Sequence, residues 1–522
     1  MKNLNFLNCL FLFFILIGLG YLATKDSLDP DFGWHFRTGQ LISERGIPRV
    51  DWYSYTMPDF PWIDHSWGSD ILIYKVYLLS GFKALLLFFL AIAALAFLIL
   101  IKKGNVRLFL LPILSGFLAI LGFLGVRPQL ITIFFVAVLW KILNEFLGNK
   151  PSQKKLAYFI PLLFFAWANL HGGFFAGLII LFLVLILELF KKTFFFKKLI
   201  ALPILRGQNY KEQPLKKILI LLAVLIFSFL ATLINPYGVS IYIEVFRTIG
   251  DSFLRFHIIE WLPLFLKSPF PVFIILYIAL FFGLLLPLRK KIEFNKLILA
   301  GVFFILSLLS QRHFVIFVIL TIPIFAEIIS LFLKELKVER VKILFSGYRK
   351  WLVLISLSGV LFCGFYSAFD EEDSSLSYPQ GALPFLKTLP LSENLFNEYG
   401  WGGYLIWKIP ERKVFIDGRM PSWRKDDQFI FGDYVKIMKV EPGFQDILKK
   451  YNIRIMLLEK GDDKDNLKRE LRAENRFSNF LIRYDWLLKF SGLSPQKSLY
   501  QELVNLDWQT IYEDKATIIL RR

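Results

Sequence analysis

Cysteine is scarce in this chain: Cys9 and Cys363 are the only two, and both lie inside apolar runs. Two such cysteines imply no disulfide framework, so they do not indicate whether the protein is in an oxidising or a reducing compartment. The sequence also contains no P-loop, no glycine-rich dinucleotide fingerprint and no nucleophile elbow. Its histidines are far apart and include no His-x-x-x-His pair, so no motif with metal-ligand spacing is present.

Ionisable residues are almost absent from the middle of the long apolar runs. Lys141, Glu188 and Glu327 occur within such runs, and each lies toward one end. Charges inside a bilayer are costly and usually mark an ion or substrate pathway. Their scarcity argues against a proton-coupled transporter and for chemistry at the membrane surface.

Hydrophobic residues, by contrast, make up 56% of the 522 residues, with 57 phenylalanines. A soluble chain must also cover its exterior with polar residues, so this composition indicates a multi-span membrane protein. The formal charge of +19 could indicate a nucleic-acid partner. The lysines, however, cluster in short segments between apolar runs, where cytoplasmic loops carry them. We therefore predict the lipid bilayer, and no nucleic acid, as a partner.

Eleven apolar runs approach or reach the length that crosses a bilayer, which is about 20 residues. We predict an all-α polytopic domain over residues 1–369, with about 11 transmembrane helices. The first run is interpreted as an uncleaved signal anchor, because it is long and further spans follow. The predicted spans are 5–23, 81–101, 108–126, 129–147, 156–170, 174–190, 218–235, 270–288, 297–311, 314–333 and 351–369.

Basic residues set the predicted orientation of these spans. With the N-terminus in the cytoplasm, the basic clusters all fall in cytoplasmic loops. The acidic loop 24–69 then lies outside the cytoplasm, and with eleven spans so does the tail from Asp370. We predict a multi-pass protein of the cell membrane with an extracytoplasmic C-terminal domain.

The tail, residues 370–522, has ordinary polarity and is long enough for one soluble domain. Its short apolar runs and turn residues predict an α/β domain with a small mixed sheet. The predicted elements are strands at 404–407, 414–416 and 453–458, a helix at 444–451, and a terminal hairpin of 510–512 with 517–520.

The first outer loop is polar, acidic and aromatic. Asp29 followed by proline suits a helix start, and Asp31 suits the positive end of the helix dipole. A broad apolar face follows, so we predict an amphipathic interfacial helix over 30–45, with Asp31 and His35 on one face. A second interfacial helix is predicted over 66–77.

Polar residues that could bind a substrate gather on the predicted outer side. An arginine there can also simply extend to lipid headgroups, and a histidine in a tight turn can serve the turn itself. Their convergence on one side favours function. The candidates for substrate binding are His35, Arg127, Asn169, His171, Arg312 and His313.

Asp29 and Asp31 are the candidates for acid–base catalysis. Asp29 has the alternative role of a helix cap, whereas a helix start does not require a second carboxylate, so we favour Asp31. A divalent cation held by Asp29, Asp31 and His35 is an alternative that stays open, and no other cofactor is indicated.

An N-terminal anchor, an acidic outer loop, many spans and a soluble outer tail together resemble the membrane glycosyltransferases of the GT-C class. That class includes the protein O-mannosyltransferases and the aminoarabinose transferases of lipid A. The chain is more closely similar to a group of bacterial multi-span proteins that share this loop. The similar stretches are Asp29-Pro30-Asp31 with Trp34-His35, Gly46-Ile47-Pro48, Asp51 and Ser54, Asn169-Leu170-His171-Gly172-Gly173, Asn235-Pro236-Tyr237-Gly238, Gly402-Gly403-Tyr404-Leu405 and Asp417-Gly418-Arg419.

The resemblance implies transfer of a sugar from a polyprenyl-phosphate donor to a hydroxyl on a lipid, glycan or protein. It implies a single inverting displacement, in which Asp31 takes the acceptor proton and Asp29 orients Asp31 or the acceptor. Arg127 and Arg312 would stabilise the departing lipid phosphate, and histidines would donate to phosphate or acceptor.

Two other function classes stay open. A transporter or flippase of a lipid-linked glycan would share the spans, but it should also carry polar groups through the membrane. A non-catalytic membrane protein would use its outer domain to bind a partner. In that class Gly402, Asp417 and Arg419 would be sensitive to substitution, whereas the loop acids would tolerate it. The turn Asp417-Gly418-Arg419 is expected to be exposed after a strand.

Overall fold

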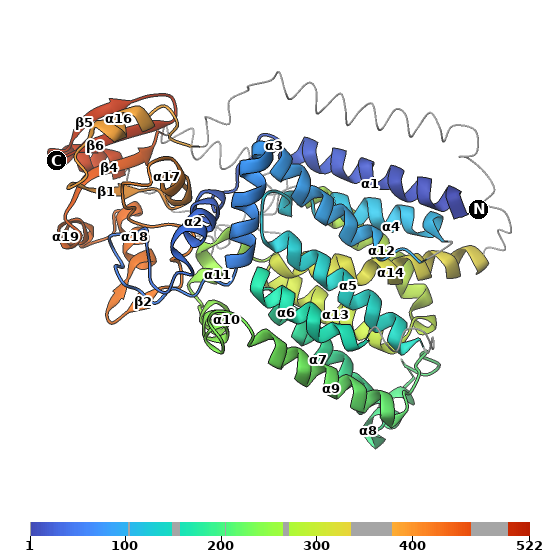
Figure 1. Cartoon of the computed structure of the whole chain (residues 1–522). Coiled ribbons are helices and arrows are strands. Elements are labelled where there is room, and N and C mark those ends of the chain that lie inside the picture. Colours follow the sequence, from blue (N-terminus) through green and yellow to red (C-terminus); the bar gives the residue numbers. More distant parts are fainter. Residues whose placement is uncertain are drawn as a thin grey trace. The chain divides into compact units, whose positions relative to one another are not determined.

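A computed structural model describes residues 2–102, 105–148, 157–203, 205–264, 271–335, 378–460 and 499–522 (Figure 1). These residues form two compact units. Unit 1 takes its residues from Met1–Ser27 and His65–Glu371, and unit 2 from Leu28–Asp64 and Glu372–Arg522. Most of the first outer loop therefore folds with the C-terminal region. The predicted domain boundary at 369/370 lies outside the described residues.

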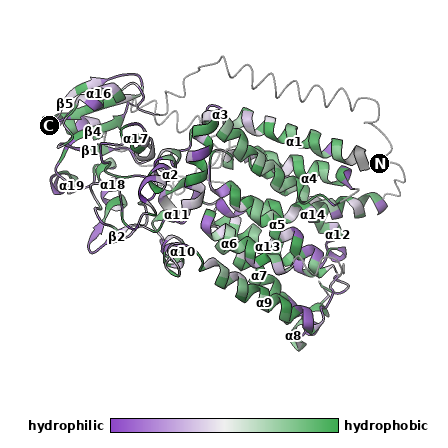
Figure 2. Ribbon diagram, viewed as in Figure 1, coloured by the Kyte–Doolittle hydropathy of each residue, from purple (hydrophilic) through white to green (hydrophobic). Residues whose placement is uncertain are grey.

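Unit 1 is a bundle of helices, and ten of them match ten of the predicted spans. Hydrophobic residues run along these helices, as Figure 2 shows. The eleventh predicted span, 351–369, lies outside the described residues. The ten are α1 (Lys2–Thr24), α3 (Trp67–Leu98), α4 (Val106–Ala119), α5 (Gln129–Leu147), α6 (Ile160–Leu170), α7 (Phe174–Phe190), α9 (Leu215–Thr232), α12 (Pro271–Leu288), α13 (Phe294–Leu309) and α14 (Arg312–Glu335).

Not all of these helices reach the length that crosses a membrane. Among the described helices, six are long and apolar enough to cross a membrane. A bent pair, α7 with α8 (Phe194–Ile200), would make a seventh. The helices α4, α6 and α13 are apolar but shorter. A helical membrane architecture is thus confirmed, whereas the number 11 is not.

Helix α14 lies at the centre of unit 1. It contacts α4, α5, α12 and α13, and 72% of its most apolar stretch is buried, against 28% for α1. Pro323 lacks an N–H and disturbs the preceding turn of α14. In that turn the Trp140 indole donates to the Leu320 carbonyl (3.0 Å).

Lysines near helix ends in unit 1 donate to backbone carbonyls. Lys141 Nζ reaches the Ile99 carbonyl just after α3 (2.6 Å), and Lys217 Nζ reaches the Phe146 carbonyl near the end of α5 (2.7 Å). The last carbonyls of a helix have no partner within it and carry the negative end of its dipole, so a lysine suits them. This explains how the predicted span at 129–147 includes Lys141.

Helix α3 contains a break at Gly81, whose φ is 72°. Only glycine adopts this backbone conformation without strain. The turns before the break include the second helix predicted over 66–77, and those after it form the predicted span. The prediction that residues 66–77 form a helix is therefore confirmed.

The sheet of unit 2 is small and mixed, as predicted. Its order is β1-β4-β6-β5, with β1 parallel to β4 and the other pairs antiparallel. The predicted strand at 453–458, the terminal hairpin and the helix at 444–451 are all confirmed. The elements are β1 (Asn394–Asn397), β4 (Ile453–Glu459), β5 (Gln509–Glu513), β6 (Thr517–Arg521), the hairpin β2 (Arg424–Lys425) with β3 (Gln428–Phe429), α16 (Leu383–Thr388), α17 (Gly402–Lys408), α18 (Ile430–Met438), α19 (Phe444–Lys450) and α23 (Leu499–Asn505).

Two predicted strands are wrong. Residues 404–407 belong to helix α17. Residues 414–416 are extended but pair outside the sheet, with the first outer loop: Val414 N–H donates to the Tyr53 carbonyl (3.0 Å), and Tyr55 N–H donates to the Val414 carbonyl (3.2 Å). Their pairing partner is thus far away in the sequence.

Helix α2 (Phe32–Arg45) confirms the predicted helix, but its apolar face is covered by protein and not by a membrane surface. It packs against α17. A Cβ on Gly33 would lie 2.0 Å from the Gly403 carbonyl oxygen, so these glycines let the two backbones touch. Trp407 of α17 meets the Phe32 ring edge-on, with centroids 5.1 Å apart.

Arg412 is expected to stabilise unit 2. Its buried guanidinium donates to the carbonyls of Leu389 (2.6 Å), Pro390 (3.1 Å) and Glu393 (3.1 Å). Arg412→Met removes these donors, so we expect a loss of about 2–4 kcal/mol in the free energy of unfolding of unit 2. Pulse proteolysis of the full-length protein in detergent across a urea series measures it. Arg454→Met, at an exposed position on β4, is the control and should change little; equal losses in both variants would contradict the prediction.

Candidate functional site

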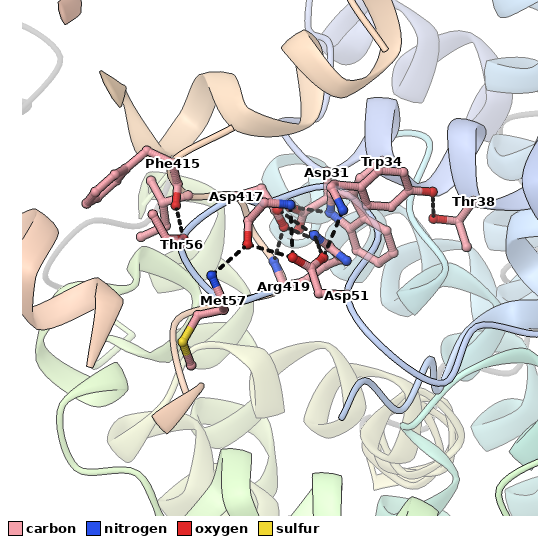
Figure 3. Close-up of polar contacts among 12 residues, drawn as sticks. Asp31, Trp34, Thr38, Asp51, Thr56, Met57, Phe415, Asp417 and Arg419 are labelled. Atoms are coloured by element: carbon pink, nitrogen blue, oxygen red, sulfur yellow. Dashed lines mark hydrogen bonds and ion pairs between the residues drawn. The ribbon is translucent and has the colours of Figure 1, made fainter. Parts of the chain in front are cut away.

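Asp417 and Arg419 are buried in unit 2, although the turn that carries them was predicted to be exposed. Figure 3 shows their polar contacts with Asp51. Arg419 Nε and Nη2 donate to Asp417 (2.8 and 2.7 Å), and Nη2 also donates to Asp51 Oδ1 (2.8 Å). The side chains are 2% exposed for Arg419 and 0% for both aspartates. This ion-paired cluster joins the first outer loop to the C-terminal part of unit 2.

Three aromatic rings enclose the Arg419 guanidinium. Its central carbon lies 4.5–5.2 Å from the ring centroids of Tyr53, Trp62 and Trp423. Burial by itself would lower the pKa of Arg419, but the carboxylates of Asp417 and Asp51 outweigh burial and raise that pKa above its ordinary value. A buried charge needs such pairing to be tolerated. Arg419 therefore stays charged and holds its partners.

Asp31 lies against the same turn. A Cβ on Gly418 would fall 1.7 Å from Asp31 Oδ1, so only a glycine fits beside this carboxylate. The Trp34 indole donates to the same oxygen (2.9 Å). The carboxylate of Asp31 is therefore positioned by α2 and by the turn at Gly418 together.

Asp29 makes the bonds of a helix cap. Its Oδ1 accepts the backbone N–H of Asp31 (2.9 Å), and its carbonyl accepts the N–H of Phe32 (3.0 Å). Side chains at a helix start accept such N–H groups because these groups have no partner within the helix. The contacts of Asp29 thus fit a role as a helix cap, which the sequence left open as an alternative to catalysis.

His35 is buried in unit 2, within electrostatic range of three carboxylates. Burial lowers the pKa of His35, although the carboxylates of Asp31, Asp64 and Asp29 act in the opposite direction. A lowered pKa keeps the imidazole neutral at pH 7. Within the described ranges, no three His, Cys, Asp or Glu side chains are grouped closely enough to hold a metal ion, and Asp29, Asp31 and His35 are no exception.

His171 lies in unit 1, where its ring is held in one tautomer. Its Nδ1 accepts the Gly173 N–H (3.0 Å) and lies 2.7 Å from Thr132 Oγ1, which in turn accepts the Trp167 indole N–H (2.9 Å). Because Nδ1 is an acceptor, the proton of the neutral ring is on Nε2. His171 therefore presents an N–H donor on its other side.

Asn169 and the glycines beside His171 shape this corner of unit 1. Asn169 Nδ2 donates to the Ile234 carbonyl (2.8 Å), and its Oδ1 accepts the Trp67 indole (3.2 Å). These bonds tie the end of α6 to α3 and to the residues after α9. A Cβ on Gly172 would lie 2.8 Å from the His65 ring. Asn169 thus has a scaffold role in the structure.

Arg127 and Arg312 meet at one carboxylate in unit 1. Glu260 pairs with Arg312 Nη2 (3.0 Å) through Oε2 and with Arg127 Nη1 (3.4 Å) through Oε1. His313 follows in the first turn of α14, and its buried Nδ1 has no hydrogen-bond partner in the part of the chain that the structure describes. The two arginines predicted to act together are therefore close together.

The candidates are divided between the two units. Unit 2 holds Asp29, Asp31 and His35, whereas the other candidates are in unit 1. In unit 1, Thr132, the hydroxyl partner of His171, lies in the first turn of α5, and Arg127 lies two positions before that helix. Sequence reasoning missed Thr132 and Glu260, which no motif marks. It noted Asp51 as part of a resemblance but gave it no role.

Comparison with protein-family models and with curated proteins gives no match. Solved structures do match. The apo oligosaccharyltransferase of Archaeoglobus fulgidus is 13% identical with a TM-score of 0.53, covering 86% of this chain and 69% of that chain. The archaeal oligosaccharyltransferase AglB of A. fulgidus, in complex with an inhibitory peptide and a dolichol-phosphate, is 12% identical with a TM-score of 0.51 over the same shares.

These matches show the fold. The chain is a membrane protein with a GT-C-type fold, which combines a polytopic helical part with a C-terminal α/β part. The GT-C resemblance found in the sequence is therefore confirmed at the level of fold. The narrower likeness to protein O-mannosyltransferases and aminoarabinose transferases is not shown.

Arg419 should be the most sensitive position of its cluster. Arg419→Met leaves two buried carboxylates without a counter-charge, so we expect unit 2 to lose roughly 3–5 kcal/mol and the first outer loop to open. Limited trypsin digestion of the full-length protein should then cut at Arg49, which is exposed, much faster. Arg424→Met is the matched control, since Arg424 is exposed and its guanidinium stacks on Phe429. Unchanged digestion of Arg419→Met would contradict the expectation.

Proposed function

We propose that this protein is an integral membrane glycosyltransferase. It moves a sugar from a polyprenyl-phosphate donor to a hydroxyl acceptor on the extracytoplasmic side. The observation that carries this proposal is the placement of Asp31 at the start of α2, where Trp34 and the Gly418 turn position its carboxylate. The GT-C-type fold supports the same reaction class.

Asp31 is assigned the role of general base. In a single displacement, the acceptor oxygen attacks the anomeric carbon while its proton passes to a carboxylate, and the lipid phosphate leaves. Inversion at that carbon follows. A base contributes only when it is held at the reacting hydroxyl, and the two contacts of Asp31 are of the kind that provide such orientation. Asp29 acts through the helix start, by fixing the backbone N–H of Asp31.

Arg127, Arg312 and His171 are assigned to the phosphate. The leaving lipid phosphate gains charge as the sugar departs, and guanidinium groups stabilise that charge best as a pair. The fixed Nε2–H of His171 supplies a neutral donor. His35 and His313 stay proposals as substrate-binding residues, and a divalent cation stays an open requirement.

Donor and acceptor are proposed only by class. The A. fulgidus neighbours were solved with a dolichol-phosphate and with an acceptor peptide, and these ligands belong to those proteins. For this chain we propose a lipid-linked donor, because such a donor would be held in the bilayer that is its proposed partner. The acceptor is proposed as a hydroxyl on a lipid, glycan or protein, and the predicted orientation of the loop places it outside the cytoplasm.

Substitution of the two loop aspartates should separate their roles. Asp31→Asn removes the base, so transfer should fall by about 10²–10⁴-fold. Asp29→Asn keeps an amide oxygen that caps a helix nearly as well, so it should lose much less. Membranes carrying each variant are supplied with a panel of radiolabelled polyprenyl-phosphate sugars, and lipid-, glycan- and protein-bound label is counted. Full transfer by Asp31→Asn would refute the assignment of the base.

Gly418 offers an independent test of how Asp31 is positioned. Gly418→Ala forces the Asp31 carboxylate to move, because the new Cβ would overlap Oδ1. A displacement of about 1 Å can cost on the order of 10²-fold in rate, so kcat should fall while donor KM changes little. Gly400→Ala is the control, since a Cβ there meets nothing within 4 Å. Equal kcat values for the two variants would contradict the role of this contact.

A further inference from the structure

Glu260 is held between two arginines in unit 1, in a short turn, η3 (Ile259–Trp261). Each of its oxygens pairs with a different guanidinium, at 3.0 Å to Arg312 and 3.4 Å to Arg127. A carboxylate that bridges two arginines in this way occupies the position where a phosphate with several acceptor oxygens would bind.

The surroundings of the two arginines are positive beyond their own charges. Arg312 is the first residue of α14, a helix of 24 residues, and Arg127 lies two positions before α5, a helix of 19 residues. Each helix N-terminus carries a partial positive charge of about half a unit. The Arg312 guanidinium also stacks on Trp261, 4.8 Å from the ring centroid, which fixes its direction.

Two guanidinium groups share this one carboxylate, and two helix N-termini add partial positive charge beside it. A phosphate monoester carries up to two negative charges near neutral pH and would match the site better. Burial alone would raise the pKa of Glu260, but Arg312 and Arg127 outweigh it and lower that pKa, so the carboxylate is ionised at pH 7.

The backbone around Glu260 is anchored, whereas its carboxylate can rotate away. Gln311 N–H donates to the Leu262 carbonyl (2.9 Å), Ser310 Oγ donates to the Glu260 carbonyl (3.3 Å), and the Gln311 side chain donates to the Ile259 carbonyl. The side chain of Glu260 remains one-third exposed, at 34%. A rotation about its side-chain bonds would vacate the site without unfolding the turn.

We infer that Glu260 is a displaceable internal anion. It keeps Arg127 and Arg312 paired before a ligand binds and competes with the lipid phosphate monoester that transfer leaves as product. The identity of this ligand rests on the proposed function, whereas the competition rests on the arrangement of the three side chains. Return of the carboxylate to the arginines would also help to expel the product phosphate after transfer.

The test measures binding and needs no sugar transfer. Purified full-length protein in detergent is titrated with farnesyl phosphate and, in parallel, with inorganic phosphate. Both Glu260→Gln and Glu260→Ala should bind farnesyl phosphate about tenfold more tightly than the parent protein, because a competing charge is gone. Arg312→Gln should weaken binding by a similar factor. Inorganic phosphate should bind much more weakly than farnesyl phosphate in every variant.

Glu244→Gln is the matched control. Glu244 is a buried acid in the same outer segment, but it pairs with Arg247 on its own helix, α10 (Ser240–Gly250), so its loss should not change binding. If both Glu260 variants bind farnesyl phosphate no more tightly than the parent while Arg312→Gln weakens binding, the competition is refuted. Equal affinity for inorganic phosphate would refute the lipid phosphate as ligand.

The two proposals fail separately. Full sugar transfer by Asp31→Asn would overturn the assignment of the base and leave the binding result intact. Tighter binding by the Glu260 variants in a protein that transfers no sugar would support the internal anion and count against the enzyme.

Discussion

The ion-paired Arg419 is the interaction on which the arrangement of unit 2 depends. It joins Asp51 of the first outer loop to Asp417, and the Arg419–Asp51 contact spans 368 positions of sequence. The loop beyond α2 has little regular structure of its own, so it takes its shape from this buried charge and the rings around it. The position of the Asp31 carboxylate follows, because the turn that carries Arg419 also carries Gly418.

Unit 1 uses polar residues at helix ends in two ways. Some complete the scaffold: Asn169 joins three elements, and Lys141 satisfies a carbonyl where a helix ends. Others remain directed at a charged partner, as Arg127 and Arg312 are at Glu260. The difference between the two groups is in their contacts, since the neutral amide of Asn169 bonds to carbonyls and an indole, whereas two guanidinium groups share the carboxylate of Glu260.

The sequence predicts the helical part of the fold well, because the apolar length of a span is a local property. It also places the strand at 453–458 and the terminal hairpin. It fails at 404–407 and 414–416, where a short apolar run does not reveal its partner: α17 faces α2, and Val414 pairs with Tyr53. Glu260 could not be identified from the sequence for the same reason, because its partners, Arg127 and Arg312, are distant in sequence. Asp29, Asp31 and His35 were found together because they are close in sequence, around the start of α2.

The cluster at Arg419 also sets an order of assembly during synthesis. The first outer loop is made early, but the residues that cover it come after more than 300 others have been added, as the 368-residue separation requires. Contacts so distant in sequence form late and at a high entropic cost. Until then the Asp51 carboxylate and the rings of Tyr53 and Trp62 have not met Arg419. The C-terminal part of the chain therefore completes this cluster, and the same turn brings Gly418 against Asp31.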